Sequence, residues 1–138
     1  MIKKITLFFF LLHNCLFASQ DYELQLYETI FPAIFEKSNL KIYSDKKGVN
    51  TLRKSKIFET IKVCQDADLV VLGSLTNLEN SCQQKPIFVT EFKLIDSYDN
   101  VFGAFYWRKG RPQIRFFNKA LESLHLKLPQ NFQKYIDR

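Results

Sequence analysis

Glycine and proline are scarce in this sequence, with four of each among 138 residues. Glycine is too rare for a Gly-rich phosphate-binding loop, and no Gly-x-Ser-x-Gly segment presents a hydrolase nucleophile. The chain also has no internal repeat and no low-complexity stretch. The missing motifs exclude enzymes that depend on a Gly-rich phosphate-binding loop or on a Gly-x-Ser-x-Gly nucleophile. The scarcity of glycine and proline and the lack of low-complexity sequence favour one folded domain over a disordered chain.

Histidine is nearly absent as well, with two in the whole chain. His13 lies in the N-terminal segment, and His125 stands between two leucines near the C-terminus. A lone histidine without an organised partner gives acid–base catalysis little support, so His125 is interpreted as a surface or packing residue. Asp66 and Asp68 form a carboxylate pair, but Asp68 is interpreted as a turn or capping residue. We therefore expect no catalytic activity and no cofactor.

The N-terminus has the order of a secretory signal peptide. Two lysines precede an apolar run over residues 5–12, and the small residues Ala18 and Ser19 follow. This run is too short for a membrane span, which needs roughly 20 apolar residues. We expect residues 1–19 to be a signal peptide and residues 20–138 to form a periplasmic domain. An uncleaved N-terminal anchor is the alternative.

The net charge and the aromatic content are typical of an ordinary folded domain. The net charge of +6 becomes +4 without the two lysines of the signal peptide, and no long basic run is present. We therefore expect no nucleic-acid partner. The chain contains 14 Phe and six Tyr, which supply enough apolar surface for a core.

Two cysteines remain after signal cleavage, Cys64 and Cys82. An even number of cysteines in an oxidising compartment indicates a disulfide. Cys64 is expected at the end of one strand and Cys82 just before another, so the two could be neighbours. Two buried, unpaired thiols are the alternative. A metal site is not expected, because His125 lies far from both thiols in the sequence.

Hydrophobic periodicity predicts alternating helices and strands. The predicted helices span residues 21–37, 49–58, 119–124 and 130–136, with a short helix or irregular link over 92–98. The predicted strands span residues 40–43, 60–64, 69–73, 86–90, 101–107 and 113–117. Asp21 and Asn118 are predicted helix caps, and Pro32 is expected to kink or split the first helix. The pattern predicts a single α/β domain with a mostly parallel sheet, a C-terminal β-hairpin and flanking helices.

The hairpin combines aromatic and cationic side chains around a turn at Gly110. Its candidate binding residues are Phe105, Tyr106, Trp107, Arg108, Arg111 and Arg115. Strand alternation places Phe105 and Trp107 on one face, with Tyr106 and Arg108 on the other. Aromatic rings beside arginine can form an interface hot spot or a stacking surface for a planar anion. The simpler interpretation is that the aromatics pack in the core and the charges face water, where they protect the hairpin edge.

The C-terminal third contains an ordered string of short motifs. Its members are Gly103-Ala104-Phe105-Tyr106-Trp107, a turn glycine at Gly110, the pair Arg115-Phe116, and Asn118 and Ala120 at a helix start. Together with the central strand Ala67-Asp68-Leu69-Val70-Val71, this string resembles the YfiR-like periplasmic proteins, mainly over residues 66–136. The resemblance implies a small periplasmic α/β protein without catalysis. Relatives of that kind restrain a membrane-bound signalling enzyme, typically a diguanylate cyclase, by binding its periplasmic sensor domain.

These observations lead to one expected function and one alternative. We expect a non-catalytic periplasmic interaction or sensor protein, with an inner-membrane sensor or signalling protein such as a diguanylate cyclase as its partner. The alternative is a periplasmic binder of a small anionic ligand, held by Tyr106, Arg108 and Arg111. An exposed aromatic hairpin would also suit a homodimer.

Overall fold

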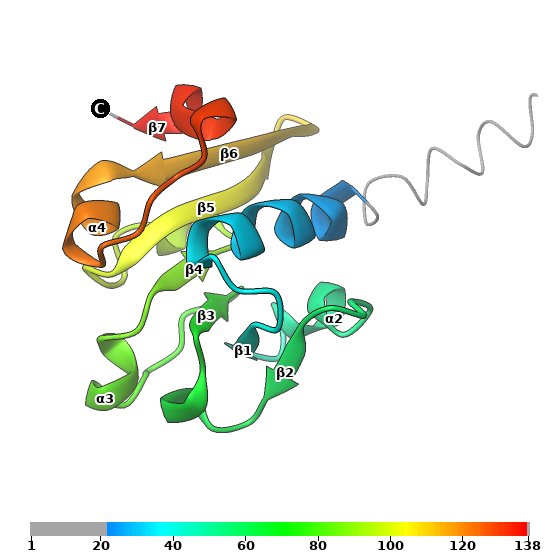
Figure 1. Ribbon diagram of the computed structural model, residues 1–138, viewed down its shortest axis with the longest axis vertical. Helices are drawn as coiled ribbons and strands as arrows, with labels where there is room; N and C mark the ends of the chain where they lie inside the picture. Colours follow the sequence, from blue (N-terminus) through cyan, green and yellow to red (C-terminus); the bar gives the residue numbers. More distant parts are fainter. Residues whose placement is uncertain (1–21, 138) are drawn as a thin grey trace, which may run out of the picture.

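A computed structural model describes residues 22–137, so the expected signal peptide (residues 1–19) and the expected cap Asp21 lie outside the described residues. Within that range, seven strands form one sheet in the order β2-β1-β3-β4-β5-β6-β7 (Figure 1). The strands are β1 (Lys41–Ser44), β2 (Glu59–Ile61), β3 (Leu69–Leu72), β4 (Ile87–Val89), β5 (Val101–Arg108), β6 (Arg111–Phe117) and β7 (Ile136–Asp137). Strands β1 to β5 run parallel, β6 is antiparallel to β5, and β7 is parallel to β6. The predicted fold class, a single α/β domain with a mostly parallel sheet, is confirmed.

The centre of the sheet is apolar on both faces. Every residue of β3 and of β4 is buried. Leu69 and Val71 pack into the core on one face, whereas Val70 and Leu72 pack into the core on the other. A strand that is covered on both faces has a continuous apolar sequence, and this is why β3 could be predicted from the sequence alone.

The N-terminal helix, residues 22–35, crosses one face of the sheet (Figure 1). Its side chains at most 3% exposed follow helical spacing: Tyr27, Ile30, Phe31 and Ile34. The rings of Phe31 and Phe88 meet edge to face, with centroids 5.1 Å apart. The helix is continuous through Pro32, so of the two predicted effects of this proline, a kink or a split, the split does not occur. Buried neighbours before and after the proline hold both halves of the helix against the same sheet face.

Short elements cover the opposite face. They are the 3₁₀ turns η1 (Cys64–Asp66) and η2 (Phe92–Leu94) and the helix α3 (Asn80–Gln83). Cys64 and Cys82 are buried there with their Cα atoms 5.8 Å apart, and they form the expected disulfide. Cys64 begins a 3₁₀ turn and does not end a strand, because β2 stops earlier, at Ile61.

The hairpin closes through a two-residue turn. Lys109 and Gly110 both have positive φ, 51° and 73°, which is the backbone of a tight hairpin turn. After β6, Asn118 is the first residue of α4 (Asn118–Ser123) and not its cap, and its side chain donates a hydrogen bond to Glu122 at 3.0 Å. The last segment is the 3₁₀ helix η3 (Gln130–Tyr135) followed by β7, so the helix expected over 130–136 is only partly right.

The predicted helix over residues 49–58 is much shorter than expected. It comprises α2 (Val49–Leu52), and the chain then turns. The hydroxyl oxygen of Ser55 accepts hydrogen bonds from the backbone N–H groups of Ile57 and Phe58, both at 3.2 Å. This side-chain bond offers the backbone an alternative to the helix, and it directs Phe58 into the core. Among the residues described, no helix has the length and hydrophobicity that crossing a bilayer requires.

Candidate functional site

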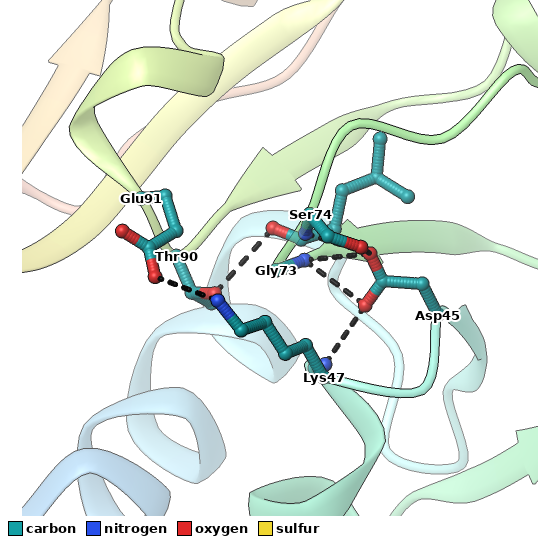
Figure 2. A network of polar contacts seen from close by, with 8 residues as sticks. Asp45, Lys47, Gly73, Ser74, Thr90 and Glu91 are labelled. Carbon is teal, nitrogen blue, oxygen red and sulfur yellow. Dashed lines mark hydrogen bonds and ion pairs between the residues drawn. The ribbon is translucent and has the colours of Figure 1, made fainter.

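A polar network lies where the parallel strands end (Figure 2). In the order β2-β1-β3-β4-β5, the switch point falls between β1 and β3. Open α/β sheets bind their ligands in the crevice at that point, outside the carboxyl ends of the strands. Here Asp45 follows β1, and Gly73 and Ser74 follow β3. The sequence predicted only a turn at Asp45.

The carboxylate of Asp45 lies in this crevice and accepts hydrogen bonds from the groups that line it. It accepts backbone hydrogen bonds from Gly48 at 2.8 Å, from Gly73 at 3.0 Å and from Ser74 at 2.8 Å. It also accepts from the hydroxyls of Ser74 at 2.9 Å and Thr76 at 3.3 Å. Partial burial opposes the charge of Asp45, but the hydrogen bonds outweigh it and lower the pKa of this carboxyl below its ordinary value.

The walls around Asp45 leave little room. A β-carbon added to Gly73 would lie 2.9 Å from the Cβ of Lys47 and 3.0 Å from the backbone nitrogen of Gly48. Lys47 also forms an ion pair with Glu91, with nitrogen and oxygen 3.7 Å apart (Figure 2). The N–H groups that could cradle a bound anion are therefore already occupied by a carboxylate of the protein itself. This network positions three loops, and it is not an anion site.

The hairpin offers a different kind of site. In the β5–β6 register, Arg108 pairs with Arg111 and Ala104 pairs with Arg115. Tyr106 lies two residues from both Ala104 and Arg108 on β5, so it shares one sheet face with Arg108, Arg111 and Arg115. Four of the six candidate residues therefore lie together, and we refer to them as the Tyr106 face.

The other two candidates belong to the opposite face. Phe105 is 2% exposed and packs against Tyr27 of the N-terminal helix, with ring centroids 6.0 Å apart. Phe105 is therefore a core residue, and its side chain contributes almost nothing to the surface of the hairpin. Trp107 is on the same side as Phe105 but remains about half exposed at 47%. The predicted alternation of Phe105 and Trp107 against Tyr106 is confirmed.

Sequence reasoning missed Phe92, which completes the Tyr106 face. Phe92 is 56% exposed, and its ring meets that of Tyr106 edge to face at 5.3 Å between centroids. With Trp107 and Arg108, these rings line a hollow of about 280 Å³. The available signal was the position of Phe92, a large apolar residue directly after the strand 86–90 and outside any amphipathic pattern.

The three arginines of the Tyr106 face differ in their surroundings. Arg115 forms an ion pair with Asp137 and lies 5.7 Å from the ring centre of Phe117. Its hydrogen bond to Tyr106 and the charge of Asp137 raise the pKa of its guanidinium, despite the opposing effect of partial burial. Arg108 and Arg111 are exposed, and no ion pair engages either of them among residues 22–137. Their charges are available to a partner.

The remaining sequence candidates have structural roles. Asp68 accepts the backbone N–H of Lys41 at 2.9 Å and pairs with Lys37 at 3.1 Å, with sequence separations of 27 and 31. It therefore joins the segment before β3 to the start of β1, and these contacts neither close a local turn nor cap a helix. His125 is exposed and has a positive φ of 55°, immediately after α4. Across the part of the chain that the structure describes, no three His, Cys, Asp or Glu side chains are grouped to hold a metal ion.

Comparison with known proteins does not assign the chain to a group: no family model and no curated protein matches it.

Proposed function

We propose that this chain is an exported, non-catalytic binding protein that recognises an acidic segment of a membrane-bound signalling protein through its Tyr106 face. The observation that carries the proposal is the grouping of Arg108, Arg111 and Arg115 around Tyr106 and Phe92 on one face of a hairpin. The partner class, an enzyme such as a diguanylate cyclase with a periplasmic sensor domain, comes from the resemblance to YfiR-like proteins.

The chemistry of this face suits an acidic protein surface. Arginine binds carboxylates through two parallel hydrogen bonds, and both arginine and tyrosine are enriched among residues that dominate binding energy. Tyr106 is 6% exposed and fixed in the core, so it lends rigidity to its arginine neighbours. Arg108 and Arg111 each present a planar, pre-organised guanidinium to a carboxylate, so less side-chain freedom is lost per hydrogen bond formed.

A crosslinking pull-down from the native cells tests the proposal, with periplasmic and membrane fractions processed separately. We expect recovery of one membrane protein with the wild-type chain and at least about tenfold less with Arg108→Ala/Arg111→Ala, given the cost of losing hot-spot residues. Arg53→Ala, which removes an exposed arginine after α2, serves as the matched control and should recover as much as wild type. Equal recovery by the double variant would refute a role for the Tyr106 face.

One observation supports a small anionic ligand as a second candidate. The hollow beside Phe92, Tyr106 and Arg108 has a volume of about 280 Å³, enough for a small planar molecule stacked on a ring. A thermal-shift screen with phosphates, nucleotides and aromatic carboxylates tests it. A ligand that raises the melting temperature of wild type but not of Arg108→Ala/Arg111→Ala, together with no membrane protein in the pull-down, would favour this candidate.

A further inference from the structure

Exposed apolar side chains gather where the parallel strands end. Leu75 follows β3 and is 81% exposed, Phe92 follows β4 and is 56% exposed, and Trp107 lies near the end of β5 and is 47% exposed. Because β3, β4 and β5 are parallel neighbours, these three residues project from the same edge of the sheet. We refer to this region as the carboxyl edge. Of the other large exposed apolar residues outside the helix, Ile57 precedes β2 and Val63 follows it, at the far side of the sheet from β5.

The N-terminal helix begins at the same edge. The ring of Tyr22, 48% exposed, lies 6.4 Å from that of Phe105, which in turn lies 5.9 Å from that of Trp107. Figure 1 shows the start of this helix, the tip of the β5–β6 hairpin and α2 on one side of the molecule. The apolar run over residues 5–12 precedes Tyr22 in the sequence, so any tether to a membrane joins the domain at this edge.

The carboxyl edge also carries an excess of positive charge. The cations in the loops and strand ends that form it are Lys46, Lys47, Lys93, Arg108, Lys109 and Arg111, all exposed. The carboxylates there are already engaged: Asp45 by backbone N–H groups and Glu91 by Lys47. The amino ends of the strands are mixed in charge: Asp66, Asp96 and Asp99 lie in the loops that lead into β3 and β5, while Lys41 begins β1 and Lys85 precedes β4. Cations therefore outnumber carboxylates at the carboxyl edge.

We propose that the carboxyl edge rests on an anionic lipid bilayer. Leucine and tryptophan at loop and hairpin tips can enter the headgroup region singly, while the surrounding cations remain at the phosphate level. Each lysine or arginine near an anionic surface adds to binding, by about fivefold in affinity per charge. The inference goes beyond the proposed function. The carboxyl edge shares Phe92, Arg108 and Arg111 with the Tyr106 face, but Leu75, Trp107 and the loop lysines belong to the lipid contact alone.

The single tryptophan of the chain makes the proposal directly measurable. The exported protein would be titrated with vesicles of phosphatidylcholine alone and with vesicles enriched in phosphatidylglycerol, while the fluorescence of Trp107 is recorded. We expect a blue shift and co-sedimentation with the anionic vesicles only, both weakened by salt. Lys46→Gln should weaken binding about fivefold. Leu75→Ser should weaken it further, because Leu75 is the most exposed apolar side chain of the edge.

Control experiments distinguish lipid binding at the carboxyl edge from self-association and from binding of the protein partner. Lys127→Gln removes an exposed cation beyond α4, away from the carboxyl edge, and should bind vesicles with nearly wild-type affinity. A blue shift that depends on protein concentration without lipid would show a second copy on this edge and overturn the proposal. Equal binding to both vesicle types, or full binding by Leu75→Ser, would overturn it as well. Partner recovery in the pull-down with no vesicle binding would reject this inference alone.

Discussion

At the scale of single residues, Asp45 decides what the switch point of the sheet can do. Its carboxylate accepts hydrogen bonds from three backbone N–H groups and two hydroxyls that belong to the loops after β1 and β3. These donors would otherwise face a crevice suited to anions. The protein therefore uses its own anion to join two loops, and these donors are engaged by Asp45 and not by a bound phosphate.

Replacing Asp45 should change how stability depends on pH. Because its pKa is lowered in the folded state, its stabilising contribution is present above the unfolded value, about 3.9, and is lost as pH falls through the lower folded value. We expect Asp45→Asn to lower the free energy of unfolding at pH 7 by about 1–2 kcal/mol. The variant should also lose less stability than wild type as pH falls below about 4.

Urea unfolding of both proteins between neutral and acidic pH measures this difference. Asp99→Asn removes an exposed carboxylate before β5 and should leave the stability at neutral pH almost unchanged. Parallel pH profiles for wild type and Asp45→Asn would contradict the assigned role of the carboxylate.

At the scale of elements, different residues of the β5–β6 hairpin have different roles: some form its turn, and others form the proposed binding face. Lys109 and Gly110 both adopt left-handed backbone, and a β-carbon at Gly110 would meet nothing within 4 Å. Any cost of substitution at Gly110 therefore comes from backbone strain and not from crowding. The arginines on either side, Arg108 and Arg111, project from the strands that this turn aligns.

Two variants should separate these roles. Gly110→Ala places an alanine at a φ of 73° and should lower the free energy of unfolding by about 1 kcal/mol. Arg111→Ala should change that free energy by less than about 0.5 kcal/mol, since it removes an exposed side chain, while it reduces binding. Chemical denaturation measures both. A destabilised Arg111→Ala would mean that the arginine supports the hairpin and is not reserved for a partner.

The elements also show where sequence patterns are informative. The helix over 22–35 and the hairpin were predicted because burial on one face imposes their period. The strand β3 was predicted because burial on both faces makes it a continuous apolar run. The helix over 49–58 was overpredicted because a single hydroxyl, that of Ser55, ends it with local hydrogen bonds. β7 was missed because it has two residues and exists only through its pairing with β6. The Tyr106 face was partly predicted, but Phe92 comes from a distant loop that only the fold brings to Tyr106.

At the scale of the whole molecule, the two ends of the sheet have different properties. The amino ends are preceded by η1 and α3, which the Cys64–Cys82 disulfide joins, and Gln65 adds a hydrogen bond to Glu79 at 2.6 Å. The carboxyl edge carries the exposed apolar tips and an excess of exposed cations. One end is therefore fastened by a covalent bond, while the other presents the chemistry that can engage a partner or a membrane.

This division predicts what reduction of the disulfide does. The bond closes a loop with a sequence separation of 18, and its loss should lower the free energy of unfolding by about 3 kcal/mol in the chain-entropy model. Since the bond lies away from the carboxyl edge and the Tyr106 face, the reduced protein should bind vesicles and partner as well as the oxidised protein, below its lowered melting temperature. Thermal unfolding with and without reductant measures the first effect, and the vesicle titration at low temperature measures the second.

The double variant Cys64→Ala/Cys82→Ala separates loss of the bond from effects of the reductant. It should melt near the temperature of the reduced wild type and should not respond to reductant. Reductant that leaves the wild-type melting curve unchanged would mean that the bond contributes nothing to stability. If binding were lost in the folded, reduced protein, the two ends of the sheet would be coupled, and the disulfide would then control recognition as well as stability.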